Sequence, residues 1–71
     1  MEKIAINTAV INLDQLLKWA GIVQTGGQVK SMIEEGMIKL NGSIVTERRK
    51  KVYPGDRIVI EGLGQWQVTM E

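Results

Sequence analysis

The chain contains no cysteine and no histidine among its 71 residues. Without them it can form no disulfide and lacks the usual ligands of a structural zinc site. The same absences remove the thiol nucleophile and the side chain that transfers protons near neutral pH. We therefore expect no catalytic residue, no metal and no cofactor, and a core of this size must supply its roughly 3–5 kcal/mol of stability by packing alone.

Aromatic residues are also scarce, with two tryptophans, one tyrosine and no phenylalanine. A platform on which successive bases stack is therefore not indicated. No segment approaches the roughly 20 apolar residues of a membrane span. The start of the chain lacks the layout of a signal peptide. We expect a cytoplasmic protein with no membrane partner and no small-molecule substrate.

The length and the hydrophobic fraction of 44% are typical of one globular domain, here residues 1–71. Its formal net charge is only +1, but the charges are unevenly distributed. Four consecutive cations occur in the sequence "TERRKK", at Arg48, Arg49, Lys50 and Lys51. Runs of this kind are usually solvated surface, so their meaning depends on what lies beside them.

The apolar pattern predicts two helices between terminal strands. Alternation predicts strands at residues 2–6 and 65–70. Leucines at helical spacing predict a first helix, with Asn12 as its N-cap and Gly21 at its end. Thr25 and Gln28 form a Thr-x-x-Gln capping box for a second helix, which Gly36 closes.

The second half predicts strands joined by tight turns. Asn41-Gly42 is the preferred pair of a two-residue hairpin over residues 37–46, with Lys39 on the outer face. Residues 53–56, Tyr-Pro-Gly-Asp, predict a type II turn before a strand at residues 57–61. The predicted fold is α+β, with two short helices packed on a small, mainly antiparallel sheet and the terminal strands paired or adjacent.

The start of the second helix is a candidate phosphate site. Unpaired amides and the helix dipole favour an anion there, and Gly26 and Gly27 would let an oxygen approach the backbone. Lys30 follows one turn later. By itself this is more often a plain capping loop. If the helices pack on the hairpin, Lys30, Lys39 and residues 48–51 would share one surface, as a site that reads a nucleic-acid backbone requires.

The segments "INLDQLLKWAGIVQTGGQVKSMIEEGMIKLNGSIV" and "VYPGDRIVI" resemble the S4-type RNA-binding domain, or alpha-L motif, over residues 11–61. The chain is most similar to small stand-alone bacterial members of the YaaA and YbcJ type. The resemblance implies a non-catalytic protein that binds structured RNA, such as ribosomal RNA or tRNA, with possible ribosome association. The residues expected to bind RNA are Thr25, Gly26, Gly27, Lys30, Lys39, Asn41, Arg48, Arg49, Lys50 and Lys51.

The chain departs from the broader S4 pattern at two positions where many members carry Arg, namely Asn12 and Gly26. A second reading also remains open, because "LNGSIV" and "PGDRIVI" resemble ubiquitin-like sulfur carriers. That alternative is a protein–protein interaction module without nucleic-acid binding. Two consecutive helices before the hairpin and the ending Thr69-Met70-Glu71, in place of Gly-Gly, fit it poorly.

Overall fold

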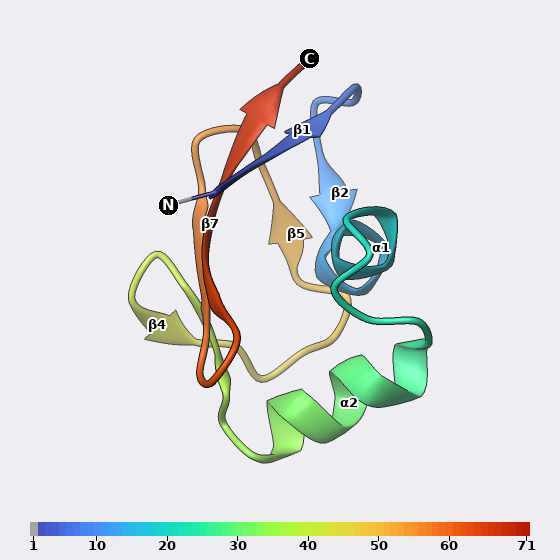
Figure 1. The fold of residues 1–71 in the computed structure, drawn as a ribbon, viewed down its shortest axis with the longest axis vertical. Helices are drawn as coiled ribbons and strands as arrows, with labels where there is room; N and C mark the ends of the chain where they lie inside the picture. The colour runs from blue at the N-terminus through green and yellow to red at the C-terminus, as the bar shows by residue number, and fades with distance from the viewer. Residues whose placement is uncertain (1) are drawn as a thin grey trace.

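The computed structural model describes residues 2–71, so Met1, the first residue of the expected domain, lies outside the described part. Two helices and seven strands are formed by these residues (Figure 1). Their bounds are β1 Glu2–Ile6, β2 Ile11–Asn12, α1 Leu13–Trp19, α2 Gly26–Glu34, β3 Ile38–Leu40, β4 Ser43–Ile44, β5 Lys51–Val52, β6 Arg57–Ile60 and β7 Gly64–Met70.

Five of the strands form one sheet in the order β1-β7-β6-β3-β4. Its pairs are antiparallel except β1 with β7, which are parallel, with Ile4 opposite Val68. The predicted mainly antiparallel sheet and the pairing of the terminal strands are therefore confirmed. Trp66 of β7 is partly buried against the core, and its indole N–H donates to the Glu2 carboxylate at 3.0 Å.

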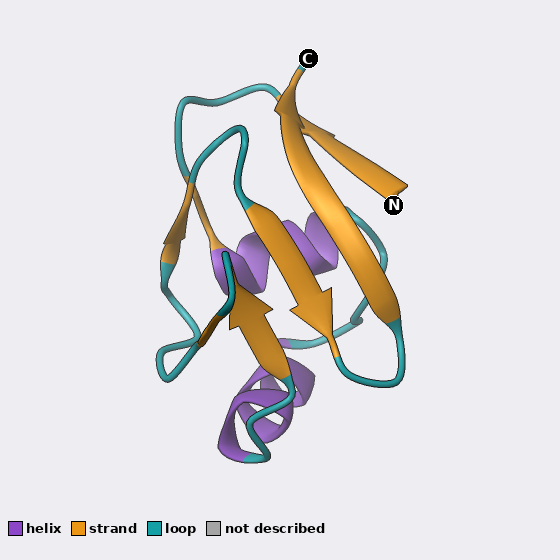
Figure 2. Cartoon of the chain, turned by 90° about the vertical axis from the view of Figure 1, so that its left-hand side faces the viewer, coloured by secondary structure: helices purple, strands orange, loops and turns teal. Residues whose placement is uncertain are grey.

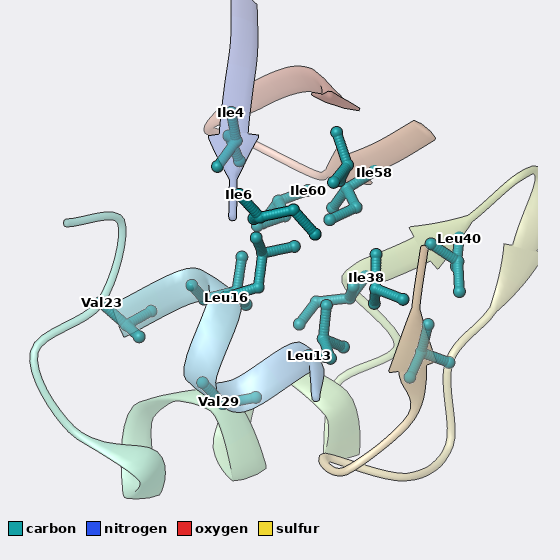
Figure 3. Close-up of a cluster of buried hydrophobic side chains, with 14 residues drawn as sticks. Ile4, Ile6, Leu13, Leu16, Val23, Val29, Ile38, Leu40, Ile58 and Ile60 are labelled. Atoms are coloured by element: carbon teal, nitrogen blue, oxygen red, sulfur yellow. The ribbon is translucent and has the colours of Figure 1, made fainter. Parts of the chain in front are cut away.

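Both helices lie on one side of this sheet. Figure 1 shows α1 beside the sheet and α2 below it. Figure 2 views the sheet from its other face, which carries no helix, with α1 behind the strands. In the close-up of the core, Leu13 and Leu16 of α1 lie between the strand residues and Val29 of α2 (Figure 3). The side chains of Leu13, Leu16 and Val29 are fully buried, so apolar packing joins both helices to the sheet.

The predicted hairpin is present with the predicted register. Leu40 is opposite Ser43, and the Val45 amide donates to the Ile38 carbonyl at 2.9 Å. Asn41 and Gly42 have φ of 51° and 88°, as a type I′ turn requires. Because side chains alternate along a strand, the two core-facing residues of β3 place Lys39 between them on the outer face.

The sequence pattern did not reveal β2 and β5. These two-residue strands form a separate antiparallel pair, with Ile11 opposite Val52 and Asn12 opposite Lys51. Each is too short to show a period, and they are far apart in the sequence. Neither α1 nor α2, the helices of residues 2–71, is long and apolar enough to cross a membrane.

Candidate nucleic-acid interface

The start of α2 is held by the predicted capping box. The Gln28 amide donates to the Thr25 hydroxyl oxygen at 3.3 Å, and the Thr25 amide donates to the Gln28 side-chain oxygen at 3.0 Å. The same Gln28 oxygen accepts from the Gln24 amide at 2.6 Å. Within residues 2–71, no hydrogen bond outside the helix ladder uses the amides of Gly26 or Gly27. These two first-turn donors therefore stay available to an anion.

The fold does not require glycine at these positions. A Cβ on Gly26 would meet no atom within 4 Å, and one on Gly27 would meet only the Thr25 hydroxyl oxygen at 3.8 Å. Neither residue has the left-handed backbone that favours glycine. In a helix interior, glycine is about 0.8–1.0 kcal/mol less favourable than alanine. Because both residues lack a side chain, the backbone of the first turn of α2 is open to close approach.

We use "basic segment" for residues 48–51, the four consecutive cations. The segment begins in a turn closed by the Lys50 amide, which donates to the Glu47 carbonyl at 3.2 Å. Its carbonyls face the start of α1: the Leu13 amide donates to the Lys50 carbonyl at 2.8 Å, and the Asp14 amide to the Arg48 carbonyl at 3.0 Å. The backbone of the basic segment is therefore part of the fold.

These contacts correct one prediction about α1. Asn12 occupies the N-cap position, but its side chain makes no capping hydrogen bond. The backbone carbonyls of the basic segment accept from the first helical amides instead. The segment and the helix start are thus held together without using any cationic side chain.

The four cationic side chains of the basic segment are exposed. Among residues 2–71, no side-chain hydrogen bond involves a lysine or arginine side chain. Their donors therefore remain free for anions in solution, and phosphate is one of the anions with which arginine and lysine form charge-assisted hydrogen bonds.

One surface hollow joins α2 to the basic segment. It has a volume of about 390 Å³ and is lined by Lys30, Ile33, Glu34, Thr46 and Arg48. Lys30 lies three residues after Gly27 in α2, so the two are neighbours on the helix surface. The start of α2, Lys30 and Arg48 therefore follow one another along a single surface, with the carboxylate of Glu34 beside them.

A second hollow lies beside the other three cations of the basic segment. Its volume is about 550 Å³, and Arg49, Lys50 and Lys51 line it together with Tyr53. The remaining lining residues are Leu40, Asn41, Glu47 and Asp56. The basic segment therefore lies between two hollows, with Arg48 on the side of α2 and the other three cations on the side of the hairpin.

The side chain of Asn41 forms two hydrogen bonds within the protein. Its side-chain nitrogen donates to an Asp56 carboxylate oxygen at 3.1 Å, and its side-chain oxygen accepts from the Arg57 amide at 2.9 Å. These contacts join the hairpin to the turn before β6. Asn41 and Asp56 both line the second hollow, so the hydrogen bond between their side chains links two of its sides.

Lys39 is not brought to this surface. It lies on the outer face of the sheet, opposite Val59 of β6, whereas Ile38 and Leu40 on either side face the core. It lines neither of the two hollows. The expectation of one surface shared by Lys30, Lys39 and the basic segment therefore holds for Lys30 with Arg48 and does not hold for Lys39.

Lys51 stands directly opposite Asn12 in the β2–β5 pair. Side chains in such a position have their Cβ atoms about 4.5–5.5 Å apart. A cation is therefore present close to Asn12, where the resemblance led us to expect an Arg.

Tyr53 is the residue of this surface that sequence reasoning missed. Its side chain is 50% exposed and lines the second hollow. The scarcity of aromatic residues indicated no stacking platform, and residues 53–56 were expected only to form a turn. The signal was the closeness of Tyr53 to the cations, two residues after Lys51. No group of three acidic side chains able to hold a metal occurs in residues 2–71.

Comparison with known proteins identifies the family. The family model described as S4 domain matches residues 4–69, so the chain belongs to the S4 domain family. The chain is 40% identical over 66 residues to the probable ribosome maturation protein RlbA of Bacillus subtilis, covering 93% of each. It is 35% identical over 52 residues to the putative RNA-binding protein YbcJ of Escherichia coli, covering 73% of this chain and 74% of YbcJ.

A match of another kind is the tyrosine–tRNA ligase of Nitrosomonas europaea, 36% identical over 64 residues. That match covers 90% of this chain and 15% of the ligase. The relatives therefore include small proteins, most of whose length the chain covers, and a segment of a much larger enzyme. The resemblance to stand-alone S4-type proteins is confirmed.

Proposed function

We propose that this protein binds structured RNA, and ribosomal RNA in particular, by contacts to the phosphate backbone. The observation that carries the proposal is the hollow that Lys30 of α2 shares with Arg48 of the basic segment, beside the free amides that open the same helix. Such a surface offers phosphates both backbone donors and cations that have no intramolecular hydrogen bonds. The proposal requires no catalytic residue and no cofactor.

The names of the relatives support the same partner. The B. subtilis relative is named a probable ribosome maturation protein, and the E. coli relative a putative RNA-binding protein. We infer from this similarity that the present chain acts on ribosomal RNA or on an assembling ribosomal particle. Thr25 and Asn41 contribute by holding the helix start and the second hollow in place.

A salt titration tests the proposal directly. Each phosphate contact releases condensed counterions, so log affinity falls linearly with log salt by about 0.7–0.9 per contact. Replacing Arg48, Arg49, Lys50 and Lys51 with Ser should reduce that slope by about 3 units. The fold should survive, since the bonds that hold the segment to α1 come from its backbone. The measurement is binding to a folded ribosomal RNA fragment across a salt series.

A matched control separates a local site from a general charge effect. Replacing Lys3, Lys18, Lys39 and Arg57 with Ser removes the same charge from exposed positions that line neither hollow. This variant should keep a slope close to that of the wild type. Equal slopes for the wild type and the variant of the basic segment would contradict the proposal. A retained protein partner in co-purification, unaffected by nuclease, would favour the protein-interaction alternative.

A further inference from the structure

We propose that Tyr53 stacks on one unpaired base of the bound RNA, so that the protein recognises the junction between a helix and an unpaired nucleotide. This inference rests on the proposed function, because it places the base beside the phosphate contacts of the basic segment. It concerns a different chemical group, since stacking requires an accessible base and phosphate contacts do not.

The position of Tyr53 supports this role. The ring is half exposed and lines the second hollow with Arg49, Lys50 and Lys51. No hydrogen bond within residues 2–71 uses its hydroxyl group. The hollow of about 550 Å³ lies within the range of pockets that accept small organic ligands, so a single base has room.

The backbone that carries Tyr53 is firmly held. The Tyr53 amide donates to the Asp56 carboxylate at 2.8 Å, and its carbonyl accepts from the Asp56 amide at 3.1 Å. The turn is also joined to β7, because the Gly55 amide donates to the Val68 carbonyl at 2.7 Å and the Asp56 carbonyl accepts from the Val68 amide at 2.9 Å. Pro54 further restricts the backbone of Tyr53. A platform ordered in advance lowers the entropic cost of binding.

The tryptophans are not placed for this role. Trp66 is partly buried in the core, and its indole N–H is bonded to Glu2. Trp19 is 62% exposed, but it lies at the end of α1, whereas the basic segment is bonded to the start of that helix. Its indole N–H donates to the Ala5 carbonyl at 3.1 Å. Tyr53 is therefore the exposed aromatic that adjoins the cations.

The test compares two RNAs, a fully paired duplex and the same duplex with one bulged adenosine. Wild-type protein should bind the bulged RNA more tightly. Tyr53→Leu, which keeps apolar bulk without an aromatic ring, should weaken binding to the bulged RNA by roughly 5- to 150-fold, the range for loss of one base–aromatic stack. Tyr53→Phe should retain the wild-type affinity. Affinity for the paired duplex should be the same for all three proteins.

Trp19→Ala is the matched control, because it removes an exposed aromatic at the other end of α1, and it should leave both affinities unchanged. A second readout places 2-aminopurine at the bulge. Its fluorescence should be quenched by the wild type and by Tyr53→Phe, and not by Tyr53→Leu. Equal wild-type affinity for the two RNAs, or equal affinity of the Leu variant and the wild type for the bulged RNA, would overturn the inference alone. Failure of the wild type to bind either RNA would overturn the proposed function as well.

Discussion

At the scale of single residues, the two glycines at the start of α2 are not required by the fold, whereas other glycines of the chain are. Gly26 and Gly27 have ordinary backbone conformations and open space where a Cβ would stand. The fold does need glycine at other positions. One is Gly55, whose φ of 98° is required by the turn that begins at Tyr53. The composition shows eight glycines without distinguishing these two uses.

We expect Gly27→Ala to weaken RNA binding without destabilising the protein. The added methyl group meets only the Thr25 hydroxyl oxygen at 3.8 Å, which is ordinary contact. Alanine is also the better helix former, by up to about 1 kcal/mol. On the ligand side, the methyl group keeps a phosphate away from the free amides. The measurements are the thermal midpoint and the affinity for a ribosomal RNA fragment.

Ser31→Ala is the control for this change. It also raises helix propensity in α2, at an exposed residue that lines neither hollow. It should preserve RNA affinity. If Gly27→Ala preserved it equally, the start of α2 would be a capping loop without a role in binding.

At the scale of the elements, α2 contributes both attraction and repulsion to the surface. Lys30 and Glu34 lie one turn apart and line the same hollow as Arg48. The carboxylate opposes phosphate at this place, since like charges repel. Glu35 follows directly in the sequence, is exposed and does not line the hollow.

Glu34→Gln should therefore strengthen RNA binding, and Glu35→Gln should do so less. Both variants remove one negative charge, so a general charge effect would change the two affinities equally. The difference in RNA affinity between the two variants should be largest at low salt, where screening is weak, and it should decrease as salt is added. The same gain for both variants would show that the hollow beside α2 does not contact phosphate.

At the scale of the whole molecule, the contact between the two ends of the chain completes the sheet. β1 pairs with β7 in parallel, and Ile4 and Ile6 of β1 are buried in the common core. This strand lines neither hollow of the candidate interface, yet a domain of this size has little stability in reserve. Loss of its packing should therefore affect every element.

Ile6→Ala should destabilise the protein by about 2–5 kcal/mol, because it leaves a cavity at a residue that is 2% exposed. Since the whole domain has only about 3–5 kcal/mol, this change removes a large part of its stability, and a loss at the upper end of the range would leave most molecules unfolded at 25 °C. Urea unfolding followed by circular dichroism provides the measurement. Val10→Ala, which truncates an exposed apolar residue, is the control. Equal midpoints for Ile6→Ala and the wild type would show that β1 adds nothing to the core.

Much of the fold was predictable from local patterns. The capping box of Thr25 and Gln28, the Asn41-Gly42 hairpin and the turn at residues 53–56 depend on neighbouring residues and on backbone preferences that each residue type carries with it. The terminal strands followed from alternation of apolar and polar residues. The structure contains the predicted caps and turns because the residues that form them are close to one another in the sequence.

Part of the candidate site was predictable in the same way. The presence of a basic run and of a glycine-opened helix can be read from the residues, and Lys30 one turn into α2 follows from helical spacing. Local sequence patterns do not tell which cations lie on the same surface, and Lys39 is an example. Its outward position was predicted, but whether the outer face of β3 adjoins α2 depends on which side of the sheet the helices cover.

Sequence by itself determined the two helices, the hairpin, the terminal strands and the absence of the residues that build disulfides and zinc sites, because these depend on residue identity and near neighbours. Only the tertiary structure decided the β2–β5 pair, the bonding of the basic segment to the start of α1, and the hollow that Lys30 shares with Arg48. Each of these joins residues that are distant in sequence or separated by a turn. The physical reason is that such contacts form only when the buried side chains of both helices and the sheet pack into one core, and no local preference encodes that arrangement.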